Sequence, residues 1–512
     1  MTENVANPTP KKRRWPRWLG AGLLLLAAAV LVFARGVDRG LNHDEHQFIA
    51  PGAILARQGA QPYRDYPLFH LPNLVFVYAA VDRLTGDLIL GTKLVSIFAS
   101  CASLGLLVLV ALRRPARGLW LAAGALALVI FDPLFFYTTG QTWNHELPTA
   151  LALGALLLLD RAGGRDSLAC SALAGLCAGL AVGCRLTFAP MLLPMGLAAF
   201  FFAVNRKRQL IHVVIFTATA TLALAPSIYY LVTAREAFLF GNLEFPRLRL
   251  LDPTDTRAQK TITFSRKLRY FVKEIVVPSW PLFLAFLATA AVPGWRWFRR
   301  REPAGLTRGL VMLVVPFFLL GCFVPSRYQY QHYFVLVPFL ALGVILGLQN
   351  ASRFAWFRAG LVAILALISI VRGIGNYRAI TDVVRPETWF STSARSTGDE
   401  IRRLVPRGKV LTLAPVFPLA GGVAIYPEFA TGPFAWRGAH LVPAERRARL
   451  HLIAPDDLET FLAADPPAAI LTGFESGTDL ETPFLEYAQR HDYRPVNLTK
   501  KRTLWRPQKT AP

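Results

Sequence analysis

Long apolar runs alternate along the chain with short polar segments, most of which are basic. A helix needs ~20 mainly apolar residues to cross ~30 Å of hydrocarbon. We assign spans at about 19–34, 89–112, 119–138, 146–160, 167–184, 187–204, 210–233, 275–294, 308–324, 332–349 and 355–373. The pattern therefore predicts an α-helical polytopic membrane protein.

One further apolar run, 68–83, is short and carries His70 and Pro72 near its start. If it does not span, the basic segments at 11–17, 113–117, 161–165, 205–208, 296–301 and 353–358 all fall on one side. If it spans, every later basic segment moves to the side opposite the N-terminus. Because basic loops stay cytoplasmic, we predict about eleven spans, a cytoplasmic N-terminus, and 68–83 along the outer interface.

The same parity places the tail outside, which divides the chain into a basic N-terminus (1–18), a transmembrane domain (19–374) and an extracytoplasmic domain (375–512). In the tail, 409–415 and 468–473 read as short buried strands, and 456–464 and 479–490 as amphipathic helices. This pattern predicts a small α/β domain. We expect a multi-pass protein of the cell inner (plasma) membrane, with this C-terminal domain extracytoplasmic.

Composition supports the membrane assignment. The 512 residues are 54% hydrophobic, and the mean hydropathy is +0.38, which excludes an ordinary soluble protein. The formal net charge of +24 does not indicate nucleic acid, because most Lys and Arg lie between apolar segments; membrane lipids are the expected surroundings. The five cysteines lie in apolar segments and form no CxxC motif, so we expect no disulfide framework.

Polar stretches that do not look like topology signals gather on the outer face. They are 43–46, 140–146, Arg185, 234–274 and 325–332. Their convergence on one membrane face is expected of a site that joins a membrane-embedded substrate to an external one.

The first of these stretches holds the adjacent carboxylates Asp44 and Glu45. A helical apolar pattern follows and stops at Gly59, and Asn42 with Glu45 forms a capping-box pattern. The spacing leaves two interpretations open. The pair is either a general base with a companion carboxylate, or a helix cap.

The second stretch, just before a span, has the same ambiguity. In one interpretation, Glu146 is a second acid of the site and Asn144 binds a sugar or phosphate oxygen. In the other, Asn144 caps the helix and the charge of Glu146 interacts favourably with the helix dipole. Four histidines, His43, His46, His70 and His145, lie nearby in sequence but form no HExxH motif. We therefore predict no dedicated metal site, and leave open a divalent cation bound by carboxylates.

Cationic residues on the outer face suggest an anionic ligand. Arg185 ends an apolar segment on the side where basic residues are disfavoured, so it is either a phosphate ligand or an interfacial anchor. The loop 234–274 is also basic, and Arg327 and Tyr328 precede a late span. A lipid-linked phosphate explains these charges, and ordinary anionic headgroups are the alternative.

The order of these features resembles a known family. A first span, outer Asp44-Glu45, a helix ending in Gly59, the 61–67 segment QPYRDYP and an apolar stretch ending near Gly86 are similar to the GT-C membrane glycosyltransferases. The pattern is nearest to the protein O-mannosyltransferase and lipid A aminoarabinose transferase group, of glycosyltransferase family 39 type. The resemblance covers about 19–200 and weakens through 210–375.

The resemblance implies an inverting enzyme that takes a sugar from a polyprenyl-phosphate carrier at the outer face. Its acceptor is a lipid, a protein or a glycan. Catalytic roles then fall on Asp44 as base, Glu45 as companion and Glu146, where the family usually has an aspartate. The implied substrate-binding residues are Asn144, His145, Arg185, Arg327, Tyr328 and His70, the last in FHLP where the family has Lys-Pro-Pro.

Two other classes of function compete with this one. A transporter or lipid flippase needs charges deep within spans or broken helices lining a midplane site. The sequence pattern places the polar groups at one face, which favours the enzyme. A membrane scaffold whose tail binds a partner is the third reading.

Overall fold

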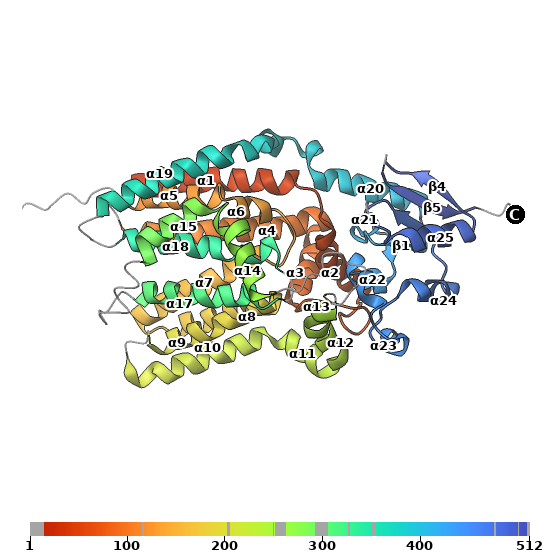
Figure 1. Cartoon of the computed structure of the whole chain (residues 1–512), viewed down its shortest axis with the longest axis horizontal. Helices are drawn as coiled ribbons and strands as arrows, with labels where there is room; N and C mark the ends of the chain where they lie inside the picture. The colour runs from red at the N-terminus through yellow and green to blue at the C-terminus, as the bar shows by residue number, and fades with distance from the viewer. Residues whose placement is uncertain are drawn as a thin grey trace, which may run out of the picture.

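The computed structural model describes residues 15–114, 117–201, 205–248, 250, 263–291, 306–325, 328–349, 355–475, 478–499 and 501–508. Long helices run along the long axis of the molecule and pack side by side (Figure 1). They are α1 (Trp15–Asp38), α4 (Leu88–Ala111), α5 (Gly118–Ile130), α7 (Glu146–Arg165), α8 (Leu168–Cys184), α9 (Leu192–Phe201), α10 (Gln209–Ala223), α17 (Leu306–Phe323), α18 (Leu336–Leu348) and α19 (Ala355–Gly373). Within this bundle α8 packs between α7 and α10, and α18 contacts α4, α5 and α17.

The bundle is that of a multi-pass membrane protein. Among the described residues, four helices are long and apolar enough to cross a membrane, and six if each of two bent pairs is one span. These four helical segments are Arg17–Asp38, Leu88–Ala111, Tyr330–Leu348 and Ala355–Val384. The count of about eleven spans stays a prediction.

Prolines explain where predicted spans break. The run 210–233 bends by 56° between α10 and α11 (Ala225–Thr233), where Pro226 in the first turn has no N–H to continue the ladder. The run 119–138 ends at Ile130, because Asp132 caps the new helix α6 (Pro133–Thr138) through the N–H groups of Leu134 and Phe135. The run 275–294 contains α15 (Trp280–Phe286), which follows a bend of 97°.

A helical hairpin lies at one end of the bundle. It joins α2 (His46–Gln58) to α3 (Asn73–Thr85), and left-handed Gly59 (φ 72°) and Gly86 (φ 65°) end the two helices. Arg57 of α2 forms a bidentate ion pair with Asp82 of α3 at 2.6 and 2.7 Å. A helix of this length reaches only ~20 Å, which agrees with an interfacial rather than spanning role for 68–83.

Residues 409–507 form a five-stranded mixed sheet with the order β2-β1-β3-β5-β4. Strands β1 (Lys409–Thr412), β2 (Ala424–Ile425) and β3 (Ala469–Thr472) are parallel, and β5 (Thr503–Pro507) pairs antiparallel with β3 and β4 (Tyr493–Asn497). Strands β1 and β3, and helices α24 (Leu458–Ala463) and α25 (Thr482–Arg490), correspond to the four elements predicted for the tail. We call α20 (Phe390–Leu404) and the residues that follow it the C-terminal unit.

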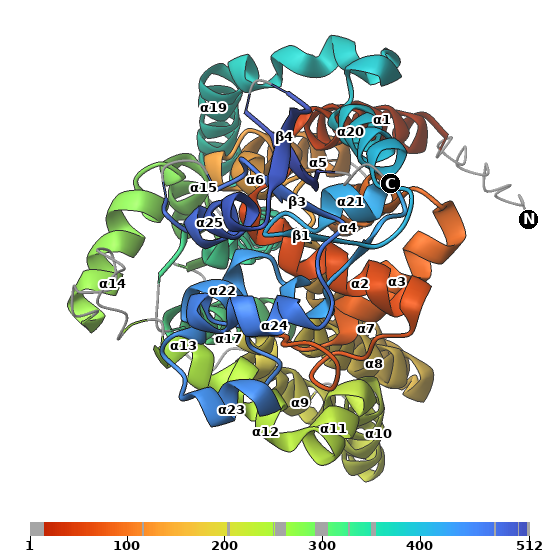
Figure 2. The same ribbon diagram turned by 90° about the vertical axis from the view of Figure 1, so that its right-hand side faces the viewer.

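The C-terminal unit sits on the hairpin end of the bundle (Figures 1 and 2). Arg395 of α20 pairs with Asp87, which caps α4, at 3.2 Å. Arg446 of α23 (Ala444–Arg449) pairs with Glu236 at 3.0 Å and with Glu244 at 2.8 Å. These ion pairs and the adjoining apolar contacts place the unit directly over the loops that carry the predicted site.

Candidate active site

The chain leaving α1 turns into the site through a local cap. Asn42 Oδ1 accepts a hydrogen bond from the Asp44 N–H at 3.0 Å, and Glu45 Oε2 accepts one from the Asn42 N–H at 2.5 Å. The predicted capping box is therefore present, and it starts the short helix His43–Glu45 that leads into α2. Such a turn directs the two neighbouring carboxylates to different sides.

Glu45 is fully buried and ties two loops together. Its Oε1 accepts hydrogen bonds from the N–H of Thr142 at 2.7 Å and from the Thr142 hydroxyl at 2.6 Å. With the bond from Asn42, one carboxylate satisfies three donors. Because both oxygens are occupied, Glu45 is built to hold the 140–146 loop in place.

Asp44 has a different environment. Its side chain is 17% exposed, and Oδ1 lies 3.0 Å from Nε2 of His43. The ring of His43 in turn faces Phe434 of the C-terminal unit, with ring centroids 6.4 Å apart. Of the adjacent pair, Asp44 is thus the carboxylate that a substrate can reach.

Lys93 is a residue of this region that sequence reasoning missed. It lies in α4 and is fully buried, and its ammonium donates to the carbonyl oxygens of Arg39 at 2.8 Å and Gly140 at 3.1 Å. The Glu45 carboxylate is among the charges that act on it. The available signal was a lysine inside an apolar helix, which is costly unless it is paired.

Three predicted substrate-binding residues meet in one buried cluster. The Arg185 Nη1 donates to Asn144 Oδ1 at 2.6 Å and lies 3.2 Å from Nε2 of His145. The Arg185 Nε donates to the Thr187 hydroxyl at 2.8 Å. Asn144 also donates to the carbonyl of Cys184 at 3.3 Å and makes no cap, since His145 occupies that position without a side-chain cap bond. The interpretation of Asn144 as a helix cap was therefore wrong.

His70 packs against the first turn of α2. Its Nε2 lies 2.9 Å from the Gln47 Oε1, and its ring stacks on Phe48 at 4.7 Å. Burial, followed by the positive charge of Arg185, lowers the pKa of His70, whereas the Asp44 charge raises it. The His70 ring is therefore neutral near pH 7.

The late stretch also reaches the cluster. The rings of His332 and His145 lie 6.4 Å apart, and those of Tyr330 and Tyr137 lie 5.0 Å apart. Tyr328 packs on Tyr270 of the 234–274 loop at 4.5 Å. Arg327 lies outside the described residues. The late stretch, Arg185 and the first two loops are thus joined by side-chain contacts at one end of the bundle.

Glu146 opens α7 and is 1% exposed. Among the described residues, neither of its carboxylate oxygens has a hydrogen-bond partner of normal geometry, although the Ser96 hydroxyl lies beside it. Arg39 and Glu45 are its charged neighbours. Across the described ranges, no group of three or more His, Cys, Asp or Glu side chains is arranged to hold a metal ion.

Comparison with solved structures identifies the fold. The fold matches ArnT from Cupriavidus metallidurans bound to undecaprenyl phosphate, with a TM-score of 0.63 and 13% identity over 96% of this chain and 98% of that one. The apo form of that ArnT matches with a TM-score of 0.60 and 13% identity, over 95% and 97% of the two chains. This chain therefore shares the fold of ArnT.

Comparison with protein families gives the family. The sequence model of glycosyltransferase family 87 matches residues 65–322, just over half of the chain. The chain belongs to glycosyltransferase family 87 and is a multi-pass membrane glycosyltransferase. The GT-C resemblance is thus confirmed, with family 87 in place of the family 39 type. No curated protein matches the sequence.

Proposed function

We propose that the enzyme transfers a sugar from a polyprenyl-phosphate carrier to an acceptor at the extracytoplasmic face of the inner membrane. In this orientation the N-terminus is cytoplasmic and the C-terminal unit extracytoplasmic. The ArnT whose fold this chain shares was solved with undecaprenyl phosphate. The carrying observation is that Asp44, whose neighbour His43 faces Phe434 of the C-terminal unit, lies at the same end of the bundle as the Arg185–Asn144–His145 cluster.

The reaction is a single displacement with inversion. Asp44 accepts the proton of the acceptor hydroxyl as its oxygen attacks the anomeric carbon. The bond between that carbon and the carrier phosphate oxygen breaks, and the electron pair leaves on the polyprenyl phosphate. The partial exposure of Asp44 and its contact with His43 suit this role, since an accessible base must meet the substrate.

The departing phosphate gains negative charge, and Arg185 is the residue that meets it. A guanidinium already held by Asn144 and Thr187 pays little reorganisation when charge develops beside it. His145, His70 and Tyr328 supply further contacts to the substrate, as does Arg327. Removing one preorganised hydrogen-bond donor from the active site of other enzymes costs ~10²–10³ in turnover.

The other two carboxylates have supporting roles in this proposal. Glu45 positions the 140–146 loop, because its oxygens are already occupied. Glu146 is the second acid of the site, and its unpartnered oxygens are free to accept hydrogen bonds from the sugar hydroxyls. A divalent cation is a further proposal: Asp44 would be its carboxylate ligand, since Mg²⁺ prefers oxygen ligands, and the ion would supply positive charge for the leaving phosphate. Turnover lost in EDTA and restored by Mg²⁺ supports it, and turnover unchanged in EDTA excludes it.

The function is tested by Asp44→Asn in the full-length enzyme. We expect release of polyprenyl phosphate from a sugar-loaded carrier to fall ~10²–10⁴-fold, the range for a lost general base. The matched control is Asp38→Asn, at an exposed aspartate that lies 3.7 Å from Arg35. Equal turnover by the two variants would rule out Asp44 as the base. No release by the parent enzyme would favour transport over transfer.

A further inference from the structure

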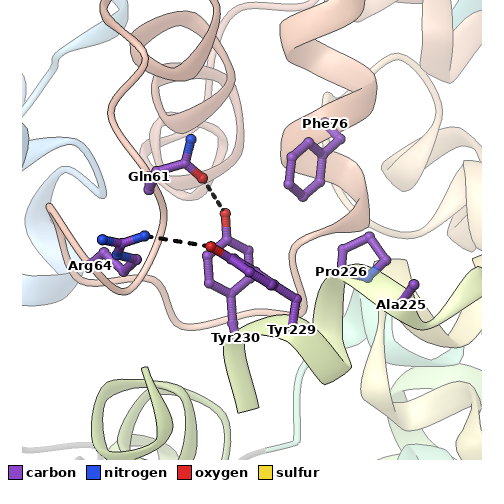
Figure 3. A pocket seen from close by; sticks show the side chains of 7 residues that line it. All are labelled: Gln61, Arg64, Phe76, Ala225, Pro226, Tyr229 and Tyr230. Carbon is purple, nitrogen blue, oxygen red and sulfur yellow. Dashed lines mark hydrogen bonds between the residues drawn. The ribbon is translucent and has the colours of Figure 1, made fainter. Parts of the chain in front are cut away.

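A second hollow lies apart from the Asp44–Arg185 site. It is a cavity of about 510 Å³ between the 61–66 turn, α3 and α11 (Figure 3). Its lining consists of Gln61, Arg64, Phe76, Ala225, Pro226, Tyr229 and Tyr230. None of these residues belongs to the site described above, so the cavity needs an occupant of its own.

The walls of this cavity are held in place without a ligand. The 56° bend into α11 sets that helix away from α10, and Pro226 stands at the bend. On the facing wall, Tyr63 has a left-handed backbone (φ 65°) and its N–H donates to the Tyr66 carbonyl at 2.9 Å. The Tyr230 hydroxyl bridges the walls by donating to Gln61 Oε1 at 2.6 Å, as Figure 3 shows.

The lining combines an available cation with open aromatic rings. Arg64 is exposed, and its guanidinium donates a long hydrogen bond of 3.5 Å to the Tyr229 hydroxyl. No described carboxylate forms an ion pair with it, and that of neighbouring Asp65 is engaged by the Gln61 N–H at 2.6 Å. The side chains of Tyr229 and Phe76 are 48% and 37% exposed. This chemistry suits a phosphate that carries a polar headgroup.

The helices around the cavity point to a lipid as the carrier of that phosphate. Large apolar side chains are exposed on α10 and α11, among them Leu222 (67%), Ile228 (42%) and Val232 (75%). In a helix bundle of a membrane protein, such a surface is expected to face hydrocarbon. A ligand with its phosphate at Arg64 thus has an apolar helix surface available for its acyl chains.

We propose that this cavity binds the headgroup of an anionic glycerophospholipid. Arg64 binds the phosphate, Tyr229 and Phe76 cover the headgroup, and the acyl chains lie along α10 and α11. The polyprenyl phosphate of the proposed reaction is assigned to the buried Arg185 cluster, which shares no residue with this cavity. The inference therefore stands independently of the transfer reaction.

Native mass spectrometry of the full-length protein in detergent tests the proposal, with phosphatidylglycerol and zwitterionic phosphatidylcholine as probes. We expect phosphatidylglycerol to bind ~10-fold more weakly to Arg64→Ala than to the parent chain, the loss typical of a charge-assisted contact. The matched control is Arg378→Ala, at an exposed arginine in the segment that follows α19, and helix α19 lies on the side of the bundle away from α11 (Figures 1 and 2). This control should bind like the parent.

Several outcomes overturn the proposal. They are unchanged phosphatidylglycerol binding in Arg64→Ala, an equal loss in Arg378→Ala, and equal binding of phosphatidylcholine to the parent chain. Displacement of phosphatidylglycerol by glycerol 3-phosphate at similar concentration would identify a site for a free anion. Displacement by polyprenyl phosphate would assign the cavity to the donor. Tyr229→Ala is the second variant, because it lowers headgroup contact without removing a charge.

Discussion

Replacing Glu45 by glutamine separates a positioning carboxylate from a catalytic one. The Glu45 carboxylate accepts three hydrogen bonds, from the Asn42 N–H and from both donors of Thr142. In the glutamine variant, one carboxylate oxygen remains as a hydrogen-bond acceptor and the other is replaced by an NH₂ group, which can only donate. If the oxygen stays with Thr142, the new NH₂ faces the Asn42 N–H, and one charge-assisted bond is lost. Such bonds contribute ~1.5–3 kcal/mol each, so we expect the Glu45→Gln substitution to lower the free energy of unfolding by about 3 kcal/mol.

The free energy of unfolding is measured in mixed micelles titrated with sodium dodecyl sulfate, beside polyprenyl phosphate release. The matched control is Glu400→Gln, at a glutamate that is 37% exposed and pairs with Arg403 on one helix. We expect a change of less than ~0.5 kcal/mol for the control, as for most surface substitutions. In the Asp44→Asn variant, by contrast, turnover should fall while stability stays near that of the parent.

A double-mutant cycle locates the effect. Thr142→Val removes only the hydroxyl donor to Glu45, and its cost should be smaller in the Glu45→Gln background by at least ~0.5 kcal/mol. Additive costs, or a Glu45→Gln variant that is as stable and as active as the parent, would refute the positioning role. Full stability with no turnover would assign chemistry to Glu45 instead.

Three further predictions follow from the same contacts. Arg185→Lys, which keeps the charge but loses the fork held by Asn144, should bind polyprenyl phosphate ~10-fold more weakly, and unchanged affinity in a flotation assay contradicts the phosphate role. Lys93→Met leaves two buried carbonyls unpaired and should lower the unfolding free energy by ~2–4 kcal/mol in the same micelle titration. Burial lowers the pKa of His46 to about 3, below its unfolded value, so the unfolded state takes up the proton first as pH falls. Stability should then drop by ~1.4 kcal/mol per pH unit below ~6.5, and His46→Gln should reduce that slope.

Local signals in the sequence predicted the parts of the fold that local physics controls. The Asn42–Glu45 capping box and the Gly59 stop depend on neighbouring residues, and both are present. The strands β1 and β3 were legible from short apolar runs. The breaks in the helices were harder to predict from the sequence. The bend before Pro226 and the early end of α5 each depend on a single proline or cap inside an apolar run. Hydrophobicity alone does not register such interruptions.

The stretches that form the candidate site could be predicted from the sequence, but the role of each residue within the site could not. The spacing left a catalytic pair or a helix cap open, and the family resemblance made Asp44 the base and Glu45 its companion. The contact of Glu45 with Thr142, 97 positions away, could not be read from the sequence. Lys93 was overlooked because its partners are backbone carbonyls, which leave no trace in the residue pattern. The Asn144–Arg185 bond likewise joins residues 41 positions apart. Long-range polar contacts were the missing information in each case.

The structure lowers the energetic cost of placing two adjacent carboxylates in a buried region. Two free negative charges on neighbouring residues repel one another and raise the cost of burial. The short helical turn sends the side chains to different sides, and Glu45 then faces three donors with the Lys93 ammonium nearby. Those groups compensate one charge inside the bundle, while Asp44 contacts His43, whose ring faces Phe434 of the C-terminal unit. Because Lys93 also binds the carbonyls of Arg39 and Gly140, the same network fixes both loops, so the position of the free carboxylate relative to Arg185 is set by contacts within the apolar core.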